Sequence, residues 1–183
     1  MKINRIILCG MLIIASACAK EKTTNTNFQT REYIEAWVSQ NYPNAVKTQH
    51  GAYILEETDG NGMFYTGEKY AYVTYTLSNM NGKITETTDE KIAQQIGSYN
   101  KGDFYGPKVW YIAKDNQTVG MQDMLKGLRV GSKRKILLPG WLNTQTEYTD
   151  IDQYLEDTES TTDIAIYEIT LESLVNNITL KQI

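Results

Sequence analysis

The stretch VGMQDMLKGLRVGSKRKILLPGW, residues 119–141, is the most regularly patterned part of this 183-residue chain. Apolar residues recur in it at helical spacing, at Met121, Met124, Leu125 and Leu128. That spacing predicts a short helix with one apolar face, and Gly131 predicts a turn after the helix. The KRKILLP segment that comes next predicts a strand ending at Pro139. The stretch offers no obvious catalytic acid or base, nucleophile or metal ligand.

The segments outside this stretch predict mainly β-strands. They are residues 52–58 (AYILEET), 68–78 (EKYAYVTYTLS), 83–87 (KITET), 108–113 (KVWYIA) and 164–174 (IAIYEITLESL). Residues 68–78 alternate most clearly, so that Tyr75 and Leu77 share one face of their strand. Asn81 and Gly82 form the residue pair expected at a hairpin turn. This pattern predicts an α+β domain, in which an antiparallel sheet of about five strands is covered on one face by a helix.

The predicted organisation around this domain is based on changes in polarity along the chain. It consists of a flexible polar tether over residues 18–29, an N-terminal helix and connection over 30–50, a domain over 51–175 and a tail over 176–183. Thr30 is the expected N-cap of the N-terminal helix, and Pro43 is expected to end it. Residues 147–163 are strongly acidic and predict a solvated loop.

The first residues have the features of an export signal. Lys2 and Arg5 precede the apolar run IILCGMLIIA, which is too short for a good membrane span, and the small residues Ser16 and Ala17 precede Cys18. This order resembles the bacterial lipoprotein signal, which implies removal of residues 1–17 and acylation of Cys18. The implied location is the bacterial cell envelope, at the outer membrane and held by lipid. A plain signal peptide cut at another bond, or an N-terminal membrane anchor, remains the alternative.

Export would leave a chain with few reactive groups. Cys9 would depart with the signal and Cys18 would carry lipid, so no thiol would remain for disulfides or catalysis. The mature chain would carry 16 basic and 22 acidic residues, a balance that argues against nucleic-acid binding. The only histidine, His50, is expected in a loop, because one imidazole without cysteine partners makes a weak metal site. We therefore expect no metal and no cofactor.

Several short motifs occur in a recognisable order. A VTYT strand at residues 73–76 precedes an Asn-Gly hairpin, then the helix and VGSKRKILLP segment, then YEITLESL at residues 167–174. This order is similar to that of the FKBP-type peptidyl-prolyl isomerases, over residues 51–175 with insertions at 88–106 and 143–162. The resemblance implies a curved antiparallel half-barrel sheet wrapped around one central helix.

The resemblance also implies prolyl cis–trans isomerisation, a reaction that needs no catalytic acid, base or nucleophile. Rotating an Xaa–Pro bond crosses a barrier of about 18–20 kcal/mol, because the amide resonance must be broken. No proton has to move and no bond has to form. An apolar pocket that prefers the twisted, less polar amide lowers the barrier by differential binding. The implied partners are proline-containing segments of exported proteins.

The resemblance assigns the pocket residue by residue. The corresponding positions are Tyr75, Ile84, Trp110, Val119, Met121 and Tyr167, with Val109 as the alternative to Trp110. The chain departs from the family at several positions; Leu77, for example, replaces the glycine that follows the strand tyrosine, and Ile84 replaces a phenylalanine. Met121 replaces the pocket-floor tryptophan, and Thr85 stands where the family has an aspartate, so a carboxylate is expected to be missing. The flap tyrosine has no clear equivalent, and Trp141 and Tyr148 are the candidates to replace it.

Three functions fit these observations. The first is a lipid-anchored prolyl isomerase acting on exported proteins. The second is a relative with weak or lost activity that uses the same pocket to bind a peptide or a partner protein. The third is a surface adhesion or glycan-binding module, which the tyrosine-rich strand 70–76 alone suggests. Tyr75 and Tyr167 favour the first two functions, because both match positions that line the family's pocket.

Overall fold

A computed structural model of the chain describes residues 26–146 and 150–178. Its elements, in chain order, are α1 (Thr26–Asn41), β1 (Val46–Lys47), β2 (Tyr53–Thr58), β3 (Tyr70–Ser78), β4 (Ile84–Thr87), α2 (Glu90–Gln95), β5 (Lys108–Tyr111), a 3-10 turn (Lys114–Asn116), α3 (Val119–Leu125), β6 (Lys133–Pro139), a second 3-10 turn (Gly140–Leu142), α4 (Ile151–Asp157) and β7 (Ile164–Val175). Seven strands form one sheet. Six of them follow the order β1-β2-β6-β7-β3-β4, and the seventh, β5, pairs with the same edge of β3 as β4 does, beside the first half of β3.

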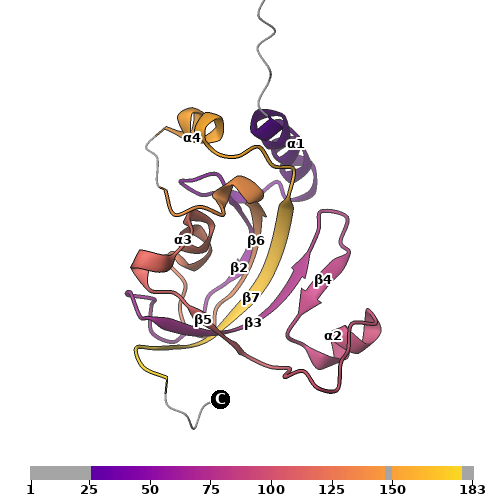
Figure 1. Cartoon of the computed structure of the whole chain (residues 1–183), viewed down its shortest axis with the longest axis vertical. Coiled ribbons are helices and arrows are strands. Elements are labelled where there is room, and N and C mark those ends of the chain that lie inside the picture. The colour runs from indigo at the N-terminus through magenta and orange to yellow at the C-terminus, as the bar shows by residue number, and fades with distance from the viewer. Residues whose placement is uncertain (1–25, 147–149, 179–183) are drawn as a thin grey trace, which may run out of the picture.

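The sheet curves around α3, which lies on its concave face (Figure 1). All strand pairs are antiparallel. The predicted α+β class, with a curved antiparallel sheet wrapped around one central helix, is confirmed. The described sheet has seven strands and not about five. Six of them correspond to the predicted segments, and the seventh is the two-residue β1, which adds to the outer edge of β2.

Helix α3 begins two residues before Met121, the first residue of the predicted helical face, and it ends before Leu128, the last. The Thr118 hydroxyl caps it by accepting a hydrogen bond from the backbone N–H of Met121 at 3.2 Å. The helix stops at Leu125 because Gly127 adopts a φ of 77°, a left-handed conformation that ends a helix. The fourth apolar residue of the predicted helical face, Leu128, therefore lies beyond the helix. It is nevertheless fully buried in the same core as Leu125.

A buried arginine from β6 fixes the end of α3 to the sheet. The Arg134 side chain is 3% exposed. Its Nη1 donates to the carbonyl oxygens of Asp123 (3.3 Å), Met124 (2.8 Å) and Lys126 (3.0 Å), and its Nη2 lies 2.8 Å from a Glu57 carboxylate oxygen. Carbonyl groups at a helix C-terminus lack partners within the helix. Arg134 supplies those partners, and the Glu57 carboxylate of β2 balances its positive charge.

Three predictions about the segments outside the sheet are wrong. Helix α1 includes Thr26–Gln29, which the sequence assigns to the tether, and Thr30 lies within the helix and not at its N-cap. The reason is tertiary: the buried Asn27 amide donates to the Leu155, Thr158 and Glu159 carbonyls at 3.2–3.3 Å and accepts from the Thr161 N–H at 2.9 Å. The segment that Asn27 contacts includes α4, whereas its acidic composition predicts a loop throughout.

The predicted signal and lipid site lie outside the described residues. This holds for residues 1–17, for Cys18 and for the tether up to residue 25. Within the part of the chain that the structure describes, no helix is long and apolar enough to cross a membrane.

The position of α3 generates a stability prediction. Leu125 is fully buried, so Leu125→Ala should lower the free energy of unfolding by about 2–5 kcal/mol, the range for truncating a buried leucine. Its neighbour Lys126 is exposed, and Lys126→Ala should change stability by less than about 0.5 kcal/mol. Urea unfolding of the two variants checks both values. Equal effects of the two substitutions would mean that α3 does not lie on the core.

Candidate functional site

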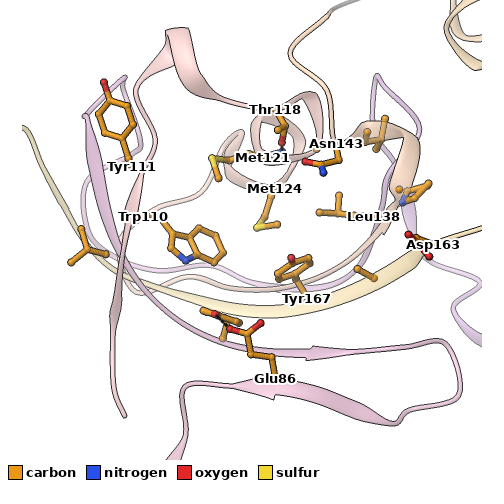
Figure 2. Close-up of a pocket in the computed structure, with 17 residues that line it drawn as sticks. Glu86, Trp110, Tyr111, Thr118, Met121, Met124, Leu138, Asn143, Asp163 and Tyr167 are labelled. Carbon is orange, nitrogen blue, oxygen red and sulfur yellow. Dashed lines mark hydrogen bonds between the residues drawn. The ribbon is translucent and has the colours of Figure 1, made fainter. Parts of the chain in front are cut away.

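A pocket of about 640 Å³ lies between α3 and the concave face of the sheet (Figure 2). Its walls come from β3, β4, β5, α3, β6 and β7 and from the turn after β6. The volume is in the range of small-molecule and peptide side-chain pockets, roughly 300–1,000 Å³. Four of the six predicted pocket residues line it: Tyr75, Trp110, Met121 and Tyr167.

One wall of the pocket is a cluster of three aromatic rings. The centroid of Tyr75 lies 5.4 Å from that of Trp110 and 6.3 Å from that of Tyr167, and Trp110 meets Tyr167 edge-on at 6.4 Å. The sheet register explains the arrangement. Trp110 pairs with Ala71, and Tyr167 pairs with Leu77, so both side chains share the face of β3 that carries Tyr75. Three separate strands therefore build one aromatic surface.

The opposite wall is aliphatic and carries sulfur. Met121 and Met124 from α3 and Leu138 from β6 point toward the aromatic rings (Figure 2). Methionine is unbranched and adapts its shape to a neighbour. At Gly120 the helix passes close to the turn after β6, and a Cβ there would lie 3.3 Å from the Cβ of Leu142. The pocket thus has a rigid aromatic side and a more adaptable aliphatic side.

A carboxylate is present in the pocket, contrary to the prediction. The Tyr75 hydroxyl donates a short hydrogen bond to the Glu86 carboxylate. Glu86 pairs with Leu77, but the next pair along is Ser78 with Ile84, which makes Thr85 the extra residue of a β-bulge. Because of the bulge, Glu86 points to the pocket face of the sheet, which carries Tyr75, and Ile84 points to the opposite face, which carries Ser78. The assignment of Ile84 to the pocket is therefore not supported, since Ile84 does not line it.

Two further assignments change for local reasons. Val119 is 1% exposed and packs in the core beneath the pocket, while Gly120 and Met121 line the cavity itself. Trp141, a candidate for the missing flap tyrosine, is 2% exposed and is not part of the pocket wall. The other candidate, Tyr148, lies outside the described residues. The exposed aromatic residue at the pocket edge is Tyr111 of β5, which strand alternation alone does not single out.

The two pocket tyrosines are both held in the protonated state. Burial raises the pKa of Tyr75, and the hydrogen bond to Glu86 and the charge of that carboxylate raise it further. Burial also raises the pKa of Tyr167, with a contribution from the charge of Glu86. Both phenols can therefore donate hydrogen bonds at neutral pH. Tyr75 already donates to Glu86, whereas the Tyr167 hydroxyl makes no hydrogen bond to the described residues.

The single histidine lies outside this pocket. His50 Nδ1 is 2.7 Å from Oδ1 of the buried Asp123, and the other carboxylate oxygen of Asp123 accepts from Thr48 at 2.5 Å. The three side chains hold the loop before β2 against α3. Within residues 26–146 and 150–178, no group of three or more histidine, cysteine or acidic side chains is placed to hold a metal ion.

Comparison with solved structures identifies the fold. FkpA from Escherichia coli aligns with a TM-score of 0.53 and 14% identity over 83% of this chain, which spans 61% of the length of FkpA. A peptidyl-prolyl cis-trans isomerase from Pseudomonas syringae pv. tomato aligns with a TM-score of 0.53 and 16% identity, over 82% of this chain and 93% of that one. Neither a protein-family model nor a curated protein matches the sequence. The structural likeness confirms the predicted FKBP-like fold, and at these identities it shows the fold alone.

The raised pKa of Tyr75 predicts how stability depends on pH. The unfolded phenol titrates near pH 10, and the folded one titrates higher. The folded state therefore retains the proton that the unfolded state loses, and the stabilisation, complete below about pH 10, is lost as the pH rises above that value. Tyr75→Phe should flatten this alkaline decline, and Glu86→Gln should reduce it by removing the charge. Urea unfolding from about pH 8 to 11.5 measures it, and identical profiles for wild type and Tyr75→Phe would contradict it.

Proposed function

We propose that this protein binds proline-containing peptide segments in the pocket and catalyses cis–trans isomerisation of the Xaa–Pro bond. The observation that carries the proposal is the single aromatic surface formed by Tyr75, Trp110 and Tyr167, which faces an aliphatic wall across a cavity of suitable size. A proline ring is flat-sided and apolar, and it buries its surface well between such walls. The fold of the Pseudomonas syringae isomerase supports the same activity.

The described groups can account for the reaction without acid–base chemistry. At the transition state the amide is twisted and its carbonyl is less polar, so an apolar wall favours it over the planar ground state. The Tyr167 hydroxyl can donate a hydrogen bond to a peptide carbonyl, because no described residue occupies it. The Tyr75–Glu86 hydrogen bond fixes the ring of Tyr75 beside Trp110. The protein then supplies orientation and burial, and the peptide supplies the rotating bond.

A binding protein with weak turnover is the second candidate, and one residue favours it. Met121 stands where the resemblance to FKBP-type isomerases implies a tryptophan, and its flexible side chain cannot offer the same flat surface to a proline ring. Binding depends on the total apolar area, which Met121 retains. Catalysis depends on discrimination between the twisted and planar amides, for which a rigid surface is better suited. We therefore expect binding to survive better than turnover.

Peptide titration separates the two candidates. Chemical-shift mapping with a short Leu-Pro peptide should perturb Tyr75, Trp110, Met121 and Tyr167 together. Trp110→Ala should weaken binding at least about fivefold, as expected for a buried aromatic contact, and Tyr33→Ala on the exposed face of α1 is the control. Exchange spectroscopy on the same peptide measures isomerisation, and Met121→Trp should increase its rate. Perturbations that avoid all four residues would rule out both candidates.

We further propose that the protein is a lipoprotein of the bacterial cell envelope, anchored in the outer membrane through Cys18, and that its substrates are exported proteins. The support is the order of residues 2–18: a basic start, a short apolar run and small residues before a cysteine. Acyl chains at Cys18, each buried CH₂ group of which contributes about 0.8 kcal/mol, would hold the domain at the membrane.

Metabolic labelling with a radioactive fatty acid tests the anchor. In cells that express the full chain, the wild type should incorporate label and fractionate with membranes. Cys18→Ser should abolish the label, because the thiol that receives the lipid is gone, and Cys9→Ser, within the predicted signal, should retain it. Label that persists in Cys18→Ser would show that Cys18 is not the attachment site.

A further inference from the structure

The charges around the pocket indicate which prolyl peptides it selects. We propose that the pocket takes segments in which a lysine or arginine lies close to the proline, and that Asp163 is the residue that selects them. This inference rests on the proposed function, because it concerns the same pocket. The features that support it are the charged side chains that line the cavity and a second hollow that adjoins it.

The rim of the pocket is acidic. Glu86 and Asp163 are the charged side chains among the described residues that line it, and no lysine, arginine or histidine does so. The two carboxylates lie at different edges of the pocket (Figure 2). Glu86 is on β4, next to Tyr75 of β3, and Asp163 comes just before β7. Two like charges at the mouth of an apolar cavity raise the local concentration of cationic ligands and repel acidic ones.

A second hollow, of about 610 Å³, continues the pocket past the turn after β6. It shares Gly140, Asn143 and Asp163 with the pocket, and it adds the carboxylates of Asp157 and Glu159. None of the described residues that line it is basic. Because they form no cluster that fits a metal ion, an organic cation on a flexible chain is the better match. A peptide with its proline in the aromatic pocket would place a neighbouring side chain here.

A buried polar group without a partner lies beside this hollow. Trp141 lines it and is 2% exposed, and its indole Nε1–H has no acceptor among the described residues. A buried donor without a partner is costly. Because Nε1 itself is not accessible from the hollow, the choice of a cationic side chain rests on the carboxylates and not on Trp141.

Asp163 is better placed than Glu86 to select a cation. Glu86 already accepts the Tyr75 hydrogen bond. The backbone of Asp163 is fixed, because its carbonyl accepts from the Gly140 N–H at 2.7 Å and its N–H donates to the Thr161 hydroxyl at 3.0 Å. Its side chain is exposed and makes no hydrogen bond or ion pair with the described residues. The carboxylate is therefore held at the junction of the two hollows and remains available.

The test uses acetylated Leu-Pro peptides that differ at one residue, which is lysine, glutamine or glutamate. One set varies the position two residues before proline, and another varies the position two residues after it. An exposed ion pair contributes a factor of about 1.5 to 5 in affinity. In at least one set the lysine peptide should bind about three- to fivefold more tightly than the glutamine peptide in about 20 mM salt. The ratio should approach one in about 500 mM salt, where exposed charges are screened.

Asp163→Asn should bring the lysine-to-glutamine ratio below about twofold, and this ratio, not the affinity for either peptide alone, is the readout. Glu32→Gln on α1 removes an exposed carboxylate that lines neither hollow, and it should keep the wild-type ratio. Equal affinity for the lysine and glutamine peptides in both sets would overturn this inference and leave the proposed function intact. A preference that survives Asp163→Asn would overturn the role of Asp163. Failure of every peptide to bind would overturn the proposed function and this inference together.

Discussion

The pairing of β3 with β7 is the constraint on which the rest of the structure depends. It runs from Tyr70 opposite Val175 to Ser78 opposite Ile166, and β7 carries β6 on its other edge. Strands from the two ends of the domain therefore meet at the centre of the sheet, and the long connection between them supplies the other parts of the site. The contact between Tyr75 and Tyr167 exists only because this register brings both side chains to one face.

The curved sheet would leave its concave face open without α3, and Arg134 is what secures that helix. A buried guanidinium is costly unless its charge is neutralised and its donors are used. Here Glu57 provides the charge, and carbonyls at the end of α3 provide acceptors. Placed by this contact, α3 directs Leu125 into the core and Met121 into the pocket. One helix thus closes the core and forms the wall of the site.

Regular patterns in the sequence predicted much of the fold and of the site. No signal in the sequence indicated local features such as the β-bulge in β4 and helix α4. Alternation placed Tyr75 and helical spacing placed Met124 and Leu125, and the order of motifs brought Tyr167 to the same pocket. Ile84 was wrongly assigned to the pocket because a bulge at Thr85 shifts the faces of β4, and alternation assumes that no residue is extra. Glu86 was missed because the resemblance places the family's carboxylate at residue 85 and not at its neighbour. Helix α4 was missed because acidic residues surround its buried Leu155, and the buried Asn27 that joins α1 to this segment carries no local signal.

Under the proposed function, the arrangement of the site would separate the choice of substrate from the chemical step. Twisting a prolyl amide involves no net charge, so carboxylates at the rim can select a peptide without changing the barrier inside the pocket. Conversely, the aromatic wall responds to the shape of the proline and not to the charges that flank it. Under that proposal, substitutions at Asp163 would change which segments bind, while substitutions at Met121 would change the isomerisation rate of a bound amide. A fold of this kind can lose turnover and keep selective binding, because the two properties depend on different side chains.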